Sequence, residues 1–157
     1  MLLRPVNESD VADVLRLNHD NVELLAPMDE PKLWRLRDVS ARFDVVTIDD
    51  AFAGFVIGMT ADSEYWSQYF TCWRDRYDDF FYLDRIVLMD TFRRRGLGTF
   101  VYDEIEKVAA NHGRMTLEAN RDNAPSRAFH EARGYQPFGE FDPDGNHPVM
   151  QYVKELA

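Results

Sequence analysis

Hydrophobic residues follow two different periodicities on either side of a polar segment in the middle of the chain. Over residues 80–89 they are nearly continuous, which is typical of a strand that is covered on both faces. Over residues 97–112 they recur every three or four positions with charged residues between them, which predicts an amphipathic helix. The chain therefore changes from strand to helix across residues 90–99.

The same patterns predict strands and helices along the rest of the chain. Runs of β-branched and aromatic residues predict strands, and apolar residues at helical spacing behind a capping residue or a proline predict helices. Two pairs of strands are joined by short polar segments and are therefore predicted to form antiparallel hairpins. The predicted strands are residues 2–6, 42–48, 52–59, 115–120, 135–141 and 149–153, and the predicted helices begin near Val11, Pro31, Ser63 and Pro125.

Two segments carry unusual residues inside this pattern. Gly54 and Gly58 interrupt a predicted strand, which indicates a bulge or a close approach of a neighbouring backbone. Residues 63–79 form an aromatic segment, whose rings fall on one face of a predicted helix. Such a stripe packs into a core or forms a pocket wall that attracts a cation. The five rings belong to Trp66, Tyr69, Phe70, Trp73 and Tyr77.

Length and charge narrow the class of protein. The chain has 157 residues, 45% of them hydrophobic, which fits one globular domain over residues 1–157. The formal net charge of −10 argues against a nucleic acid partner and suits a cationic partner such as an amine. We see no signal peptide, and the longest uncharged run, residues 51–61, is too short to span a membrane. Cys72 is the single cysteine, so we expect a cytoplasmic protein without an internal disulfide.

The segment from residue 90 to residue 99 carries three arginines and two glycines at a predicted helix N-terminus. Free N–H groups and the helix dipole favour an anion at such a position, and glycines let the main chain approach it. A P-loop would need a lysine that is missing, and a dinucleotide fingerprint would need a glycine in place of Val101. The remaining pattern, Arg-x-x-Gly-x-Gly, predicts a phosphate-bearing cofactor; the alternative is a helix cap without a ligand.

A second sequence block, further along the chain, makes the identity of the predicted cofactor more specific. Residues 120–135 read Asn-Arg-Asp-Asn-Ala-Pro-Ser-Arg-Ala-Phe-His-Glu-Ala-Arg-Gly-Tyr. This block and the arginine segment together resemble the GNAT (GCN5-related N-acetyltransferase) superfamily, whose pattern here is Asn-x-x-Asn-x-x-Ala/Ser-x-x-Phe-Tyr-Glu-x-x-Gly-Phe. Only the tyrosine of Phe-Tyr-Glu changes in character, to His130. The resemblance covers residues 80–135, and residues 82–87 are similar to a group of small, uncharacterised bacterial acetyltransferases.

The resemblance implies a three-layer α/β fold, in which a mixed and mostly antiparallel sheet is flanked by helices on both faces. It also implies acetyl-CoA as the cofactor, held between two strands that splay apart. The arginine segment would hold the pyrophosphate, and strand main-chain groups and the second block would hold the pantetheine arm. Asn120 and Asn123 can also form a turn or a helix cap, and that role is compatible with contact to the cofactor. The implied cofactor residues are Ile86, Val87, Leu88, Arg93, Arg94, Arg95, Gly96, Leu97, Gly98, Thr99, Asn120, Asn123, Ser126 and Phe129.

Acetyl transfer to an amine needs a base for the ammonium group and a donor for the oxyanion, which a backbone N–H near Leu88 could supply. Asp84 and Glu118 are the candidate bases, because each lies in a strand beside the expected cofactor gap. The alternatives are an arginine ion pair for Asp84 and an outward-facing position for Glu118. Strand alternation predicts that Asp84 and Arg85 point to opposite faces. His19 is a third candidate base.

The departing thiolate needs a proton or a stabilising dipole. His130 takes the place of a tyrosine that is proposed to donate this proton in many GNAT enzymes, so it is the candidate acid; the alternative is that it packs beside Phe129 or bonds a carbonyl. Cys72 need not act as a nucleophile, because direct transfer forms no covalent intermediate. We expect no metal.

These residues predict an acetyl-CoA-dependent N-acetyltransferase that moves the acetyl group directly to the primary amine of a small molecule. The aromatic segment and the acidic balance favour a small amine as the acceptor, without a nucleic acid or membrane partner. Two alternatives remain from the sequence: a non-catalytic acyl-CoA-binding or regulatory module on the same fold, and a nucleotide-binding protein outside this family. The sequence leaves open whether the protein forms a homodimer.

Overall fold

The strands pair into one mixed sheet. The computed structural model describes residues 1–23, 25–92 and 95–156. Within these ranges the sheet order is β1-β2-β3-β4-β5-β7-β6, and among the described strands only β4 and β5 run parallel. The sequence predicted this mixed, mostly antiparallel arrangement. The strands are β1 (Leu2–Pro5), β2 (Arg42–Ile48), β3 (Ala51–Thr60), β4 (Phe81–Leu88), β5 (Arg114–Asn120), β6 (Gln136–Phe141) and β7 (Val149–Glu155).

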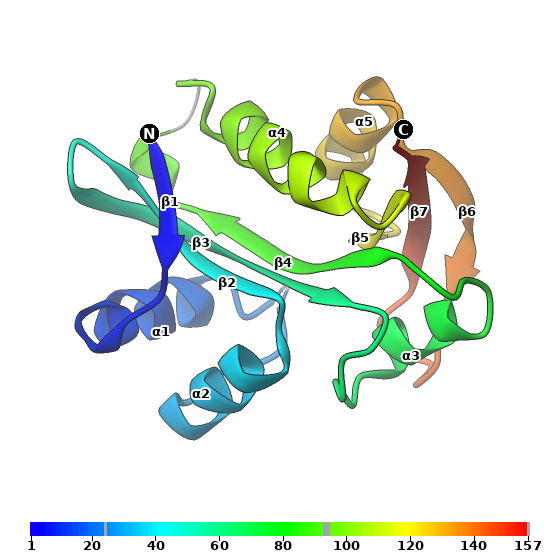
Figure 1. Ribbon diagram of the computed structural model, residues 1–157, viewed down its shortest axis with the longest axis horizontal. Coiled ribbons are helices and arrows are strands. Elements are labelled where there is room, and N and C mark those ends of the chain that lie inside the picture. Colours follow the sequence, from blue (N-terminus) through cyan, green and yellow to red (C-terminus); the bar gives the residue numbers. More distant parts are fainter. Residues whose placement is uncertain (24, 93–94, 157) are drawn as a thin grey trace.

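Helices cover both faces of the sheet, which gives the three layers that the resemblance implied. On one face lie α1 (Val11–Asp20), α2 (Glu30–Val39) and α3 (Gln68–Arg74), and on the other lie α4 (Leu97–Ala110) and α5 (Ala124–Ala132) (Figure 1). Each face buries its own cluster of apolar side chains. Leu33 and Trp73 belong to the first cluster, and Val101 and Ile105 belong to the second.

The two glycines of β3 lie where neighbouring atoms leave no room for a side chain. A Cβ atom on Gly54 would come within 2.3 Å of the Val87 carbonyl oxygen, and one on Gly58 within 2.4 Å of the Phe81 ring. Against β2, Val46 pairs with Gly54 and Thr47 pairs with Phe52, which leaves Ala53, next to Gly54, as an extra residue in β3. The predicted bulge and close backbone approach are both confirmed.

The aromatic segment forms a shorter helix than the sequence predicted. The Ser67 side chain accepts a hydrogen bond from the Tyr69 N–H and caps α3, which ends at Arg74, so one helix over residues 63–79 is wrong. Phe70 and Trp73 are fully buried, and Tyr69 and Tyr77 pack against the same cluster, so four of the five rings belong to the core or its edge. Trp66 lies before the helix and is 51% exposed.

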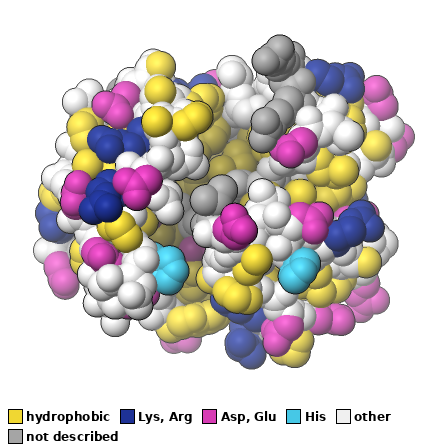
Figure 2. Space-filling view, turned by 180° about the vertical axis from the view of Figure 1, so that it is seen from behind, with side chains coloured by type: hydrophobic (Ala, Val, Ile, Leu, Met, Phe, Trp, Pro, Cys, Tyr) yellow, Lys and Arg dark blue, Asp and Glu magenta, His cyan; other side chains and the backbone are white. Residues whose placement is uncertain are grey.

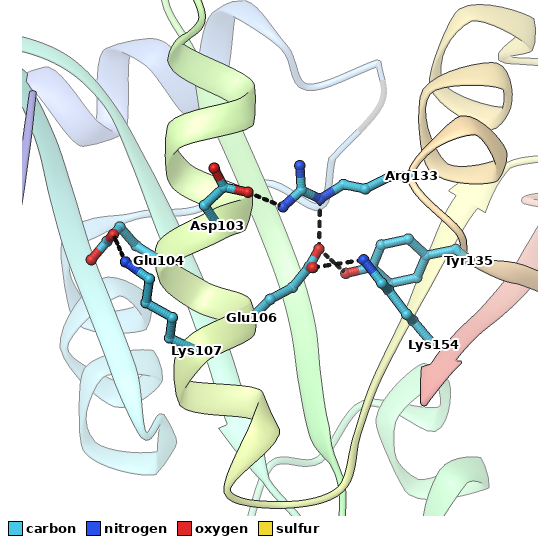
Figure 3. A network of polar contacts seen from close by, with 7 residues as sticks. All are labelled: Asp103, Glu104, Glu106, Lys107, Arg133, Tyr135 and Lys154. Atoms are coloured by element: carbon cyan, nitrogen blue, oxygen red, sulfur yellow. Dashed lines mark hydrogen bonds and ion pairs between the residues drawn. The ribbon is translucent and has the colours of Figure 1, made fainter. Parts of the chain in front are cut away.

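A polar network on Glu106 fastens α4 to the end of α5 and to β7 (Figure 3). Its two carboxylate oxygens accept hydrogen bonds from Arg133 Nε at 2.6 Å, Tyr135 Oη at 2.9 Å and Lys154 Nζ at 2.8 Å. Burial raises the pKa of Glu106, but the hydrogen bonds from these three groups outweigh it, and the pKa falls below its ordinary value. Glu104, two residues earlier and on the other side of α4, contacts only the exposed Lys107 in this view.

Glu106→Gln should lower the free energy of unfolding by about 2 kcal/mol at pH 7, because it leaves partly buried cations without their carboxylate. A lowered pKa in the folded state means that this contribution is present above the unfolded pKa of about 4.3 and is lost as the pH falls through the folded value. Urea unfolding at neutral and acid pH measures it. Glu104→Gln is the matched control and should change stability by less than about 0.5 kcal/mol; an equal loss in both variants would contradict a special role for Glu106.

Candidate active site

A cavity opens where β4 and β5 part. Their parallel pairing is limited to Phe81 with Met115 and Tyr82 with Thr116, although both strands continue beyond these pairs. The space between them is a cavity of about 220 Å³, walled by β4, β5, the start of α5, one residue of α4 and the loop after α1. Viewed from the side opposite to Figure 1, the molecule is hollowed along its middle, with hydrophobic side chains on the floor of the hollow (Figure 2).

A second cavity, of about 410 Å³, continues from β4 to the N-terminus of α4. It shares Ile86 and Val87 with the first cavity, so the two adjoin along β4. Gly96 occupies the N-cap of α4 with a φ of 75°, and a Cβ atom placed there would meet nothing within 4 Å. A glycine N-cap offers no side-chain acceptor to the N–H groups of the first turn. Among the described residues no side chain caps these N–H groups, so this helix end has the open space and the donors that a phosphate requires.

The free edge of β4 faces the gap. The Met89 N–H donates to the Ala53 carbonyl oxygen of β3 at 2.8 Å. Because successive N–H groups of a strand point to opposite sides, the N–H of Leu88 is turned away from β3 and toward the side of β5. An extended ligand in the gap would therefore meet unpaired strand groups.

Most of the cofactor residues implied by the sequence line these two cavities. Arg95 does not; its guanidinium lies 5.7 Å from the centre of the Phe92 ring. Arg93 and Arg94 lie outside the described residues. The second cavity is lined by Ile86, Val87, Leu88, Gly96, Leu97, Gly98, Thr99 and Phe129, and the first by Ile86, Val87, Asn120, Asn123 and Ser126.

The two asparagines have the turn and cap contacts that the sequence also offered. Asn123 Oδ1 accepts a hydrogen bond from the Ser126 N–H at 3.2 Å and caps α5. Asn120 Oδ1 accepts one from the Asp122 N–H at 3.0 Å. These bonds fix both side chains at the wall of the first cavity.

Asp84 and Arg85 lie on the same face of β4, so the prediction of opposite faces is wrong. Ile57 pairs with Arg85 and Gly58 pairs with Leu83, which leaves Asp84 as an extra residue in the strand and breaks the alternation. Both side chains line the cavity and form an ion pair, with Arg85 Nε donating to Asp84 Oδ2 at 2.8 Å.

Both carboxylate oxygens of Asp84 are engaged, because the Tyr65 hydroxyl donates to its Oδ1 at 2.6 Å. Arg85 also holds α1 and the segment after it, with Nη1 donating to Asn18 Oδ1 at 3.1 Å and to the Ala26 carbonyl oxygen at 3.3 Å. The ion pair that the sequence offered as the alternative for Asp84 is therefore confirmed.

Glu118 lies in the cavity wall, and the alternative of an outward-facing position is wrong. Trp73 Nε1 of α3 donates to its Oε1 at 3.4 Å. Burial raises the pKa of Glu118 well above its ordinary value; hydrogen bonds from Tyr82 and Trp73 oppose this rise, and the charge of Asp84 adds to it. Glu118 thus accepts a proton more readily than an exposed carboxylate does, which suits a general base.

His130 is buried in the same wall and bonds through both ring nitrogens. Its Nδ1 lies 2.7 Å from the Ser126 carbonyl oxygen, which can only accept, so Nδ1 carries the hydrogen. Its Nε2 therefore accepts the hydroxyl hydrogen of Tyr102 at 2.6 Å. Burial lowers the pKa of His130 and raises that of Tyr102, which favours the neutral form of both groups.

The cavity wall also contains polar side chains that the sequence did not identify as site residues, namely those of Tyr102, Arg85 and Asn21. Tyr102 lies four residues after Gly98 and three before Ile105, so its helical spacing on the inward side was an available signal.

His19 lines a different depression, between α1 and α2. Cys72 is held between Gln151 Nε2 and the Tyr69 carbonyl oxygen, and burial raises the pKa of its thiol.

Several solved structures share this architecture. Ard1 from Thermoplasma volcanium superposes with a TM-score of 0.76 at 16% identity, over 99% of this chain and 97% of that one. The ribosomal-protein-S18-alanine N-acetyltransferase from Escherichia coli gives 0.70 at 16%, over 99% and 94%. NAA60 from Arabidopsis thaliana in complex with acetyl-CoA gives 0.75 at 16%, over 99% of both chains. At these identities the likeness establishes a common fold.

The same fold is found in proteins that are named acetyltransferases. The profile of the acetyltransferase (GNAT) family matches residues 9–135, so the chain belongs to this family, as its two sequence blocks predicted. It is accordingly an N-acetyltransferase with acetyl-CoA as its co-substrate. None of the described helices is long and apolar enough to cross a membrane.

Proposed function

We propose that this protein acetylates the primary amine of a small molecule by direct transfer, with Glu118 as the base. The observation that carries the proposal is the cavity through the sheet, which adjoins an anion-binding helix end along β4 and contains two carboxyl groups. An ammonium group must lose a proton before it can attack, and a carboxylate of raised pKa beside the cavity can accept that proton.

Acetyl-CoA fits the residues that are present. The N–H groups at Gly96 to Thr99 would hold its pyrophosphate, together with Arg93 to Arg95, and the free edge of β4 at Ile86 to Leu88 would hold the amides of its arm. Asn120, Asn123, Ser126 and Phe129 would line the other side of the arm. The bound group would supply an activated acetyl thioester, and the N–H of Leu88 would donate to the oxyanion.

The surroundings of the cavity favour a small acceptor. Tyr69 Oη of α3 donates to the His147 carbonyl oxygen at 3.1 Å, and its ring packs edge-on against Phe141 at 5.7 Å. These contacts hold the loop between β6 and β7 against α3. On the other side, Arg85 fixes the segment after α1 by donating to the Ala26 carbonyl oxygen at 3.3 Å. Two anchored segments beside the cavity leave less room for a folded protein than for a small amine.

The competing acceptor is a peptide N-terminus, because one structural neighbour is named for an alanine of ribosomal protein S18. A screen for CoA release should contain small amines, amino acids, peptides with free N-termini and intact basic proteins. We expect turnover of small primary amines. Acetylation of peptides or proteins with all small amines inert would overturn the proposed acceptor, and CoA binding without any turnover would favour the non-catalytic module.

A further inference from the structure

The hydroxyl of Tyr102 is a polar group of the cavity wall for which the function proposed above has no role. It reaches the cavity from α4, while its partner His130 comes from α5. The Tyr102 ring is fixed edge-on against Phe129 at 5.0 Å and against His130 at 5.4 Å. The ring is therefore held in place, and the hydroxyl hydrogen is the part that can rotate.

Tyr102 and Glu118 lie on opposite faces of the sheet. Tyr102 packs in the cluster that contains Leu117 and Ala119, the two strand neighbours of Glu118. Glu118 points to the other face, where it meets Trp73. One wall of the cavity thus offers a proton acceptor and the opposite wall offers a hydroxyl donor.

We propose that Tyr102, positioned by His130, donates the hydrogen bond that stabilises the sulfur when the acetyl group leaves it, an inference that rests on the function proposed above. His130 acts as the positioning residue and not as the donor. Its only N–H is held by the Ser126 carbonyl oxygen, and its other nitrogen is an acceptor. The Tyr102 hydroxyl can turn from that nitrogen to another acceptor in the cavity.

The step balances without any further reactant. Acetyl transfer forms a carbon–nitrogen bond and breaks the carbon–sulfur bond, whose electron pair stays on sulfur. Glu118 takes the proton that the ammonium group loses before it attacks, and the second proton, which the nitrogen loses as the amide forms, passes to solvent. Tyr102 donates a hydrogen bond to the charged sulfur and keeps its own proton, and solvent supplies the proton that yields the thiol. Burial raises the pKa of Tyr102, which keeps the hydroxyl protonated.

Single and double variants test this assignment. Tyr102→Phe should lower kcat by about tenfold to a hundredfold, with the KM for acetyl-CoA within about twofold. His130→Phe should lower kcat less, and His130→Gln should restore part of it, because the amide oxygen can still accept from Tyr102. The double variant Tyr102→Phe with His130→Phe should be no slower than Tyr102→Phe alone. The proposal would be overturned if the kcat losses of the two single variants multiplied in the double variant. It would also be overturned if only the His130 variants lost kcat.

A binding measurement provides a readout that does not depend on turnover. At pH 9, where part of the thiol is ionised, calorimetry should show that wild type binds CoA more tightly than desulfo-CoA, by about threefold or more. Tyr102→Phe should reduce this preference toward one. Tyr135→Phe is the matched control, since it also removes a buried hydroxyl, and it should keep both the preference and kcat. An equal preference in wild type and Tyr102→Phe would overturn the inference, whereas wild-type CoA binding without turnover of any amine would overturn the proposed function.

Discussion

Glu118→Gln is expected to lower kcat by about a hundredfold or more at pH 8, with the Kd for acetyl-CoA within about twofold, because general bases contribute roughly 10² to 10⁴. The base acts only when it is ionised, and its pKa is raised by burial. The wild-type kcat should therefore rise with pH through the pKa of Glu118, and this rise should disappear in the variant. Steady-state rates across pH and calorimetry with acetyl-CoA measure the two effects.

The controls separate chemistry from folding. Glu140→Gln changes an exposed carboxylate on β6 that pairs only loosely with Arg121, at 3.9 Å, and should leave kcat unchanged. Asp84→Asn should instead lower the melting temperature, because it leaves the buried Arg85 without its ion pair. A Glu118→Gln enzyme that keeps more than half of its kcat and its pH dependence would show that another group accepts the proton.

Gly96→Asp is expected to abolish the thermal stabilisation of the protein by CoA, a loss of at least about a hundredfold in affinity, or about 2.7 kcal/mol. A ligand at a hundred times its Kd stabilises the native state by about this amount. The new side chain would add a negative charge in the open space at the N-cap of α4, where the pyrophosphate is proposed to lie. Thermal unfolding with and without CoA measures the loss.

Gly113→Asp is the matched control for this experiment. Gly113 has a φ of 80°, and a Cβ atom there would also meet nothing within 4 Å, but it lies beyond the other end of α4. Both variants carry the same backbone strain and the same added charge. The control should lose some stability and keep the full shift with CoA. Retention of the shift by Gly96→Asp would place the phosphate site elsewhere.

The elements and the helix end could be predicted because each depends on neighbours in the sequence. The strand over residues 80–89 and the helix from Leu97 follow from periodicity, and the position of Gly96 follows from the change between the two. The role of the glycines in β3 was also local, since a residue without Cβ marks a close approach wherever the chain folds.

The features that were missed depend on contacts between distant segments. The bulge at Asp84 is set by the pairing of β4 with Gly58, so no period of two could place Asp84 and Arg85 on one face. The burial of Glu118 requires Trp73, which lies 45 residues earlier in the chain. The bond between Tyr102 and His130 joins two helices across 28 residues. Such contacts become visible only when the sheet places these segments together.

The short pairing between β4 and β5 also bears on how the chain reaches its native state. Strands β1 to β4 come from residues 2–88 and strands β5 to β7 from residues 114–155, so each half of the sheet is one continuous piece of chain. Loop-closure entropy grows only with the logarithm of loop length, so joining β4 to β5 costs about as much as joining β5 to β7. The first closure aligns two residue pairs, and the second aligns seven. The β4–β5 junction therefore gains fewer backbone pairs than the β5–β7 junction for a similar loss of chain entropy. Side chains and the α4 crossover hold this junction together. The backbone groups left unpaired there are the ones proposed to face acetyl-CoA.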